Sequence, residues 1–190
     1  MSQRRSITRG FAGFLAVFSV VALLVPAGAS AHRGPRTLRG WGSGYTALTL
    51  DSGTAGVLTN GLGLSVAPIA PATQSGLTFN FPIDGSATAT MHTGLIRHSG
   101  GISLSGGGTT VDLTNFVIDP ANASLTAKVS VIAGGMTTFL GRVGIVSLDT
   151  TRTPITAYLT PTALRALGGA FGVDLGSMPL ILGTATVNFR

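Results

Sequence analysis

Along most of the chain, apolar and polar residues alternate in short stretches that Gly, Asn, Asp and Pro separate. An alternation with a period of two is typical of strands that bury one face, and Thr, Val and Ile favour strands. The pattern therefore predicts an all-β fold, an antiparallel β-sandwich of about nine or ten short strands. The predicted strands are residues 45–50, 64–69, 77–82, 88–98, 101–105, 110–118, 124–131, 142–148, 155–159 and 183–189.

Two short helices are expected between these strands. Thr160 can cap a helix with its hydroxyl, and Pro161 suits the first helical turn, so a helix is predicted to begin there and to end at Gly168. Asp51 can likewise cap a helix over residues 52–60. Glycine-rich turns join several strands, because glycine accepts the positive φ angles of tight hairpins.

The N-terminus has a pattern of its own, which predicts export. Arg4 and Arg5 begin a basic segment, and residues 11–25 form a mostly apolar stretch of fifteen residues. Small residues then lead to Ala31, so residues 1–31 are predicted to be a signal peptide cleaved after Ala31. The stretch is shorter than the roughly 20 residues that span a bilayer, so no stable membrane insertion is expected after cleavage. Both the general and the twin-arginine export routes stay open.

Charge divides the rest of the chain into two parts. Residues 32–40 form a basic arm that we expect to be flexible, and residues 41–190 are long enough for one domain with its own core. From Gly40 onward, six basic residues balance six aspartates. A nucleic-acid binder needs clustered Lys and Arg, so this class of partner is excluded. The chain has no cysteine, which excludes disulfides and thiolate metal sites.

Catalytic groups are hard to find in this sequence. A hydrolase needs a nucleophile beside a base, yet no Gly-x-Ser-x-Gly motif occurs and the chain has three histidines. The aspartates lie at predicted strand ends, turns and helix caps, where solvation and capping explain them. We therefore expect a protein that is not an enzyme.

The most notable polar pair is His92 and His98, which lie on one face of the predicted strand 88–98. Six residues of extended chain separate them by about 20 Å, too far for one small ion. They could approach each other only if Gly94 bends the strand. The pair is a weak candidate for a metal site.

A resemblance to a known family rests on several short motifs in a fixed order. His98, Gly100 and Ile102 form a His-x-Gly-x-aliphatic motif, and Trp41 and Tyr45 lead the first strand. The other matching segments are residues 111–119, residues 125–127, Leu148-Asp149, Leu159-Thr160 and residues 183–185. In this order the chain resembles the Htaa domain family of secreted and surface bacterial proteins, some of which bind haem.

The resemblance implies a haem site. In that family a tyrosine of the first strand ligates the haem iron, and the histidine of the motif lies beside it, which implies Tyr45 as the metal ligand and His98 as its neighbour. A phenolate suits ferric iron. Phe171 stands where the family tends to have another tyrosine, and its ring and Met91 would pack against the porphyrin. Tyr45 also follows Trp41 more closely than in the family.

Two interpretations of function remain open from the sequence. The first is an exported cell-envelope or secreted protein that binds haem, with haem or a haem-carrying protein as its partner, in a pocket beside Tyr45 and His98. The second is a structural or adhesive β-sandwich module of the cell surface that holds no cofactor. Both place the protein outside the cytoplasm, either secreted or at the cell surface or periplasm.

Overall fold

A computed structural model of the protein describes residues 44–84, 94–176 and 180–189. The predicted signal peptide, the basic arm, Trp41, Met91 and His92 lie outside these residues. In the part described, eleven strands form one antiparallel sheet. They are β1 (Gly44–Leu50), β2 (Ser65–Ile69), β3 (Thr73–Ser75), β4 (Thr78–Pro82), β5 (Ile96–Arg97), β6 (Gly101–Gly106), β7 (Thr109–Asp119), β8 (Ser124–Ala133), β9 (Met136–Asp149), β10 (Ile155–Leu159) and β11 (Leu180–Phe189).

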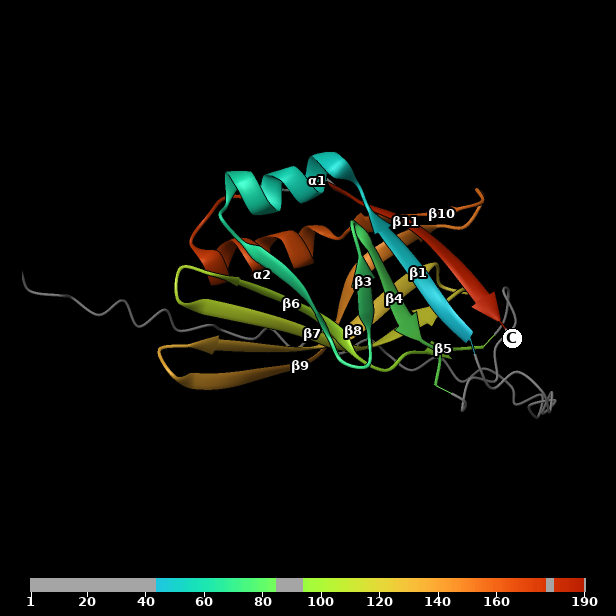
Figure 1. Ribbon diagram of the computed structural model, residues 1–190, viewed down its shortest axis with the longest axis horizontal. Coiled ribbons are helices and arrows are strands. Elements are labelled where there is room, and N and C mark those ends of the chain that lie inside the picture. The colour runs from blue at the N-terminus through green and yellow to red at the C-terminus, as the bar shows by residue number, and fades with distance from the viewer. Residues whose placement is uncertain (1–43, 85–93, 177–179, 190) are drawn as a thin grey trace, which may run out of the picture. The chain divides into compact units, whose positions relative to one another are not determined.

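The strand order shows how the chain closes its sheet. The strands follow one another as β2-β6-β7-β8-β9-β10-β11-β1-β4-β3, and β5 pairs with β7 beside this path. The sheet curls strongly, so that β4 and β7 face each other across the core (Figure 1). Phe81 of β4 and Phe116 of β7 meet there in an edge-to-face contact, with ring centroids 5.0 Å apart.

A short segment around His98 completes the curl by bridging β4 and β7. Its backbone bonds alternate between the two sides: Ser99 N donates to Pro82 O at 3.0 Å, and His98 N donates to Phe116 O at 2.9 Å. An isolated antiparallel bridge also joins Ile83 and His98. The predicted sandwich is therefore a single, nearly closed sheet, and His98 lies at its seam.

The two helical segments are capped as the sequence predicts. Asp51 accepts a hydrogen bond from Thr54 N at 2.9 Å and precedes α1 (Ser52–Gly56), which continues as the π-helical turn η1 (Val57–Gly61). Thr160 Oγ1 accepts from Ala163 N at 3.1 Å at the start of α2 (Pro161–Phe171). The predicted end of α2 at Gly168 is wrong, because the helix continues to Phe171 and ends at Gly172, whose φ of 69° is left-handed.

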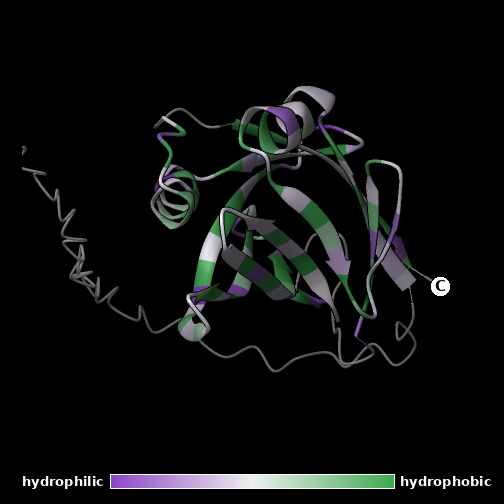
Figure 2. Cartoon of the chain, turned by 60° about the vertical axis from the view of Figure 1, so that its left-hand side comes forward, coloured by the Kyte–Doolittle hydropathy of each residue, from purple (hydrophilic) through white to green (hydrophobic). Residues whose placement is uncertain are grey.

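One hydrophobic core fills the curled sheet beneath the helices. Polar and apolar positions alternate along the strands around this core (Figure 2). Phe79 of β4 and Leu164 of α2 are fully buried, and Ile96 is 1 % exposed. Leu164 fastens α2 to the core of the sheet.

The all-β prediction is confirmed, and most predicted strands appear within a few residues of their expected bounds. Of the predicted strand 88–98, residues 88–93 lie outside the described residues, and in the remainder only Ile96–Arg97 forms a strand. The sequence pattern missed β3 and the first six residues of β9. No helix among the described residues is long and apolar enough to cross a membrane.

Candidate binding site

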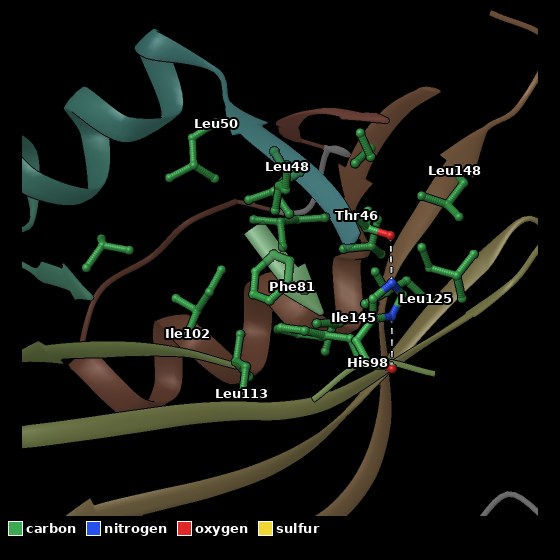
Figure 3. A pocket seen from close by; sticks show the side chains of 18 of the residues that line it. Thr46, Leu48, Leu50, Phe81, His98, Ile102, Leu113, Leu125, Ile145 and Leu148 are labelled. Atoms are coloured by element: carbon green, nitrogen blue, oxygen red, sulfur yellow. Dashed lines mark hydrogen bonds between the residues drawn. The ribbon is translucent and has the colours of Figure 1, made fainter. Parts of the chain in front are cut away.

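The interior of the curled sheet contains an apolar pocket with a single titratable side chain. Of the described residues that line it, only Thr46 and His98 are polar. Leu48 and Leu50 of β1 form one wall, and Ile145 of β9 lies on the opposite side (Figure 3). The pocket has a volume of about 80 Å³. Such a space suits an apolar ligand.

His98 is held at the pocket wall by two hydrogen bonds. Its Nε2 lies 2.6 Å from Thr46 Oγ1, and its Nδ1 lies 3.3 Å from the carbonyl oxygen of Phe116, as the dashed lines in Figure 3 show. Both His98 and Thr46 are 4 % exposed. The backbone N–H of His98 donates to the same Phe116 carbonyl. The ring is therefore fixed by contacts with two strands, β1 and β7.

The charge state of His98 follows from its burial. Desolvation lowers the pKa of His98 from 6.5 to about 4, although the hydrogen bond to the Phe116 backbone acts in the opposite direction. The imidazole is thus neutral at neutral pH. A carbonyl can only accept, so Nδ1 carries the proton and donates to Phe116 O. Nε2 then presents a lone pair, which accepts the Thr46 hydroxyl proton.

A β-bulge in β7 places the Phe116 carbonyl. The pairing of β7 with β8 shifts between Thr114 and Val117. Asn115 takes a positive φ of 51° there and is exposed, whereas Phe116 is buried and lines the pocket. Bulges of this kind redirect side chains next to functional sites. The irregularity therefore shapes the pocket wall around His98.

Tyr45 and His98 do not meet in this pocket. Side chains alternate across a strand, and Thr46, Leu48 and Leu50 line the pocket, so Tyr45 lies on the opposite face of β1. Its Cα partners are Pro82 of β4 and Asn188 of β11, and it is half-buried. The structure thus brings Thr46, rather than Tyr45, to the histidine.

Phe171 is also outside the pocket. It is the last residue of α2 and packs, half-buried, against the hydrophobic core. Leu167, one turn earlier in the helix, lines the pocket instead. Among the described residues, no group of three or more His, Asp or Glu side chains could hold a metal ion.

Sequence reasoning identified His98 but missed most of the pocket. Thr46, Leu50 and Leu58 were predicted only as strand or helix residues. The signal that was available is the alternation in residues 45–50, because Leu48 and Leu50 share a face with Thr46 and not with Tyr45.

The fold has known counterparts. No protein-family model matches the chain, and no curated protein matches it in sequence. Among solved structures, the C-terminal domain of HtaA from Corynebacterium glutamicum is 16% identical, with a TM-score of 0.56, covering 79% of this chain and 98% of that domain. The N-terminal domain of HtaA is 14% identical, with a TM-score of 0.58, covering 80% and 98%.

A third structure has the same architecture. Heme binding protein HtaB from Corynebacterium glutamicum is 13% identical, with a TM-score of 0.52, and the match covers 79% of this chain and 93% of HtaB. The chain therefore has an Htaa-like fold, and the resemblance seen in its sequence motifs is confirmed at the level of the fold.

Proposed function

We propose that this protein is an exported, non-enzymatic binding protein that holds haem in the apolar pocket beside His98. The observation that carries the proposal is the pocket itself, whose apolar walls surround one neutral imidazole. Pockets of this composition bind apolar ligands, and a single polar group orients them. The shared fold with a structure described as heme binding protein HtaB supports haem as the ligand.

The chemistry of the pocket fits haem, whereas its size requires a movement. The apolar lining suits a porphyrin face, and a bound haem would supply an iron that accepts a nitrogen or phenolate ligand. Pockets for drug-sized ligands measure roughly 300–1,000 Å³, against the 80 Å³ found here. Leu58 of η1 and Leu167 of α2 line the pocket from the helical side. We therefore include an outward movement of a helix in the proposal.

Two side chains are candidates for the iron ligand. His98 Nε2 has its lone pair at the pocket wall and would exchange the Thr46 hydroxyl for the iron. Tyr45, which the family resemblance implies, could ligate only a haem bound at the outer face of β1. Phe171 would contact the ring only after a movement of α2. The pocket geometry favours His98.

Titration of the purified protein with haemin, followed by visible absorbance, tests the proposal. We compare wild type with His98→Gln, which keeps hydrogen-bonding groups but removes the imidazole, and with Tyr45→Phe, which removes the phenol oxygen. Wild type is expected to give a saturable Soret band. His98→Gln should weaken binding by at least tenfold, equivalent to about 1.4 kcal/mol, whereas Tyr45→Phe should not.

The remaining outcomes are equally informative. Loss of the band in Tyr45→Phe alone would move the haem to the outer face of β1. No saturable band with any folded variant would end the haem proposal. Circular dichroism of each variant shows whether the sheet is intact.

A second candidate function is a structural or adhesive module without a cofactor. The observation that favours it is a group of exposed apolar side chains on β9, among them Phe139 at 80 % exposure. Such a patch marks a contact surface, either for another protein or for a membrane. A protein that binds no haemin and still has this surface would support the second function.

A further inference from the structure

The hairpin of β8 and β9 carries apolar side chains that the core does not use. Met136 is 75 % exposed, Phe139 80 % and Leu140 49 %. The hairpin turns at Gly134 and Gly135, whose φ angles of 57° and 79° suit a tight turn. Its tip lies at the same end of the sheet as the tip of the β6–β7 hairpin (Figure 1). That neighbouring tip carries only Gly, Ser and Thr.

The exposed apolar groups belong to both faces of the hairpin. Phe139 pairs with Ser130, whose strand neighbour Val129 points into the core, so Phe139 lies on the outer face. Met136 pairs with Ala133 on the inner face, and Leu140 borders an apolar groove beneath α2. A flat protein partner would cover one face. Apolar groups on both faces instead suit immersion of the tip in an apolar medium.

Addition of a partner strand along the outer edge of the β8–β9 hairpin, formed by the first part of β9, is disfavoured. The register of β8 and β9 shifts at Leu140, and the next residue, Gly141, has a φ of 79°. A bulge of this kind interrupts the edge and protects it from pairing with another strand. The apolar side chains of the tip therefore need an occupant that does not use backbone hydrogen bonds.

Charge on the hairpin indicates what that occupant is. Residues 129–141 contain no charged side chain, and Lys128 and Arg142 flank them on the two strands. These two residues are Cα partners, so both positive charges lie in one row across the hairpin. Arg142 donates from Nη1 to the carbonyl oxygen of Asn115, which holds its guanidinium on the outer face. Asp112 lies two strands from Phe139 and accepts from Ser103.

We propose that the β8–β9 hairpin docks the protein on a lipid bilayer with anionic headgroups. The tip with Met136, Phe139 and Leu140 enters the boundary between headgroups and acyl chains, and Lys128 and Arg142 lie against the lipid phosphates. Interfacial binding of this type scales with buried apolar area and with attraction to anionic lipid. It requires no membrane span. The groove beneath α2 would then open beside the lipid.

The absence of cysteine allows a site-specific test. Phe139→Cys in the full chain carries a polarity-sensitive fluorophore, and Leu77→Cys, at another exposed apolar position (42 % exposed), is the matched control. Both are mixed with vesicles of equimolar phosphatidylglycerol and phosphatidylcholine. The dye at position 139 is expected to brighten and to escape a water-soluble quencher, whereas the dye at position 77 stays accessible.

Further variants separate the parts of the proposal. In the labelled protein, Lys128→Gln should weaken vesicle partition about fivefold, because one basic residue near the surface is worth that much. Met136→Ser should weaken it as well, on vesicles of any charge. Lys128→Gln should have no effect on pure phosphatidylcholine vesicles.

Several results would overturn the proposal. One is an equal response of the two dye positions, which would mean that another segment binds the vesicles. Another is an unchanged partition of Lys128→Gln on anionic vesicles. A third is quencher protection at position 139 that rises with protein concentration in the absence of lipid, which would assign the tip to a second copy of the chain. Haem binding is not needed for any of these measurements.

Discussion

The buried histidine His98 dominates the chemistry of the interior that the structure describes. His98 is fixed between Thr46 and the Phe116 carbonyl, and its surroundings are otherwise apolar. Burial lowers the pKa of His98 to about 4, so the folded protein keeps the ring neutral over a range in which an unfolded chain would protonate it. Proton binding to His98 therefore opposes folding.

The stability of the protein should depend on pH through His98. As pH falls below 6.5, the unfolded chain takes up the proton first, and the folded state follows only near pH 4. The free energy of unfolding should thus be highest above pH 6.5 and should fall by about 3 kcal/mol by pH 4. Urea unfolding of wild type and His98→Gln over this range measures the effect.

The two proteins differ only at residue 98, so the difference between their stability curves isolates the contribution of the histidine. Wild type should lose its advantage over His98→Gln as pH falls. Parallel stability curves for the two proteins would contradict the assignment of a depressed pKa to His98.

The sequence was sufficient to select His98 but not to select its partner. Tyr45 and Thr46 are adjacent in a strand, and a shift of one residue in register exchanges the faces on which they lie. Leu48 and Leu50 indicate the face of β1 that lines the pocket, whereas Tyr45, the iron ligand that the family resemblance implies, lies on the other face. His98 became buried because the segment around it bridges β4 and β7, a long-range contact that no local pattern reveals.

At the scale of elements, the pairing of β11 with β1 leaves no space for a side chain at Gly183. Gly183 of β11 pairs with Leu50 of β1, and a Cβ atom at Gly183 would overlap the carbonyl oxygen of Thr49. The φ of Gly183 is 156°, which side chains rarely adopt. A Cβ atom added at Gly144 of β9 would meet no other atom within 4 Å. The two glycines therefore differ sharply in the space that they leave for a side chain.

Gly183→Ala is expected to destabilise the protein strongly, and Gly144→Ala is its control. The added methyl at residue 183 meets backbone, which cannot rotate away, so the free energy of unfolding should fall by at least about 2 kcal/mol. Gly144→Ala should change it by no more than about 0.5 kcal/mol. Urea unfolding of the two variants provides the comparison, and equal losses would contradict the lack of space at Gly183.

The elements that sequence reasoning missed have physical reasons. β3 has three residues, all exposed, so no buried face produces an alternation. The first part of β9 is exposed on both faces and bulged at Leu140, which removes the period-two pattern. By contrast, β6, β7 and β8 each bury apolar residues over part of their length, and the alternation there predicted these strands well. The alternation of apolar and polar residues therefore reveals a strand only where one of its faces is buried.

On the scale of the whole molecule, β11 joins two parts of the sheet. On one side of it lie β10, β9, β8, β7, β6 and β2, in that order, and on the other side lie β1, β4 and β3. Thr184 has Cα partners on both sides, Thr156 in β10 and Thr49 in β1. Thr73 is the first residue of the edge strand β3. Substitutions at Thr184 and at Thr73 should therefore have very different effects on the free energy of unfolding.

Proline substitution tests the joining role of β11. Thr184→Pro removes a backbone donor from a strand with neighbours on both sides and should lower the free energy of unfolding by about 3 kcal/mol or more. Thr73→Pro, at the start of an edge strand, should cost about 1 kcal/mol or less. Urea denaturation followed by far-ultraviolet circular dichroism distinguishes them. A similar cost at both positions would show that β11 does not hold the sheet together.

The position of β11 also bears on when the domain folds. β1 begins the described sheet and β11 is the last strand in chain order, yet the two are neighbours. Contacts between distant segments form late, because a long loop must close before they yield any free energy. A growing chain thus has no partner for β1 on this side until β11 has been made. Such a topology slows folding before the whole domain has been made, which is compatible with the export proposed above.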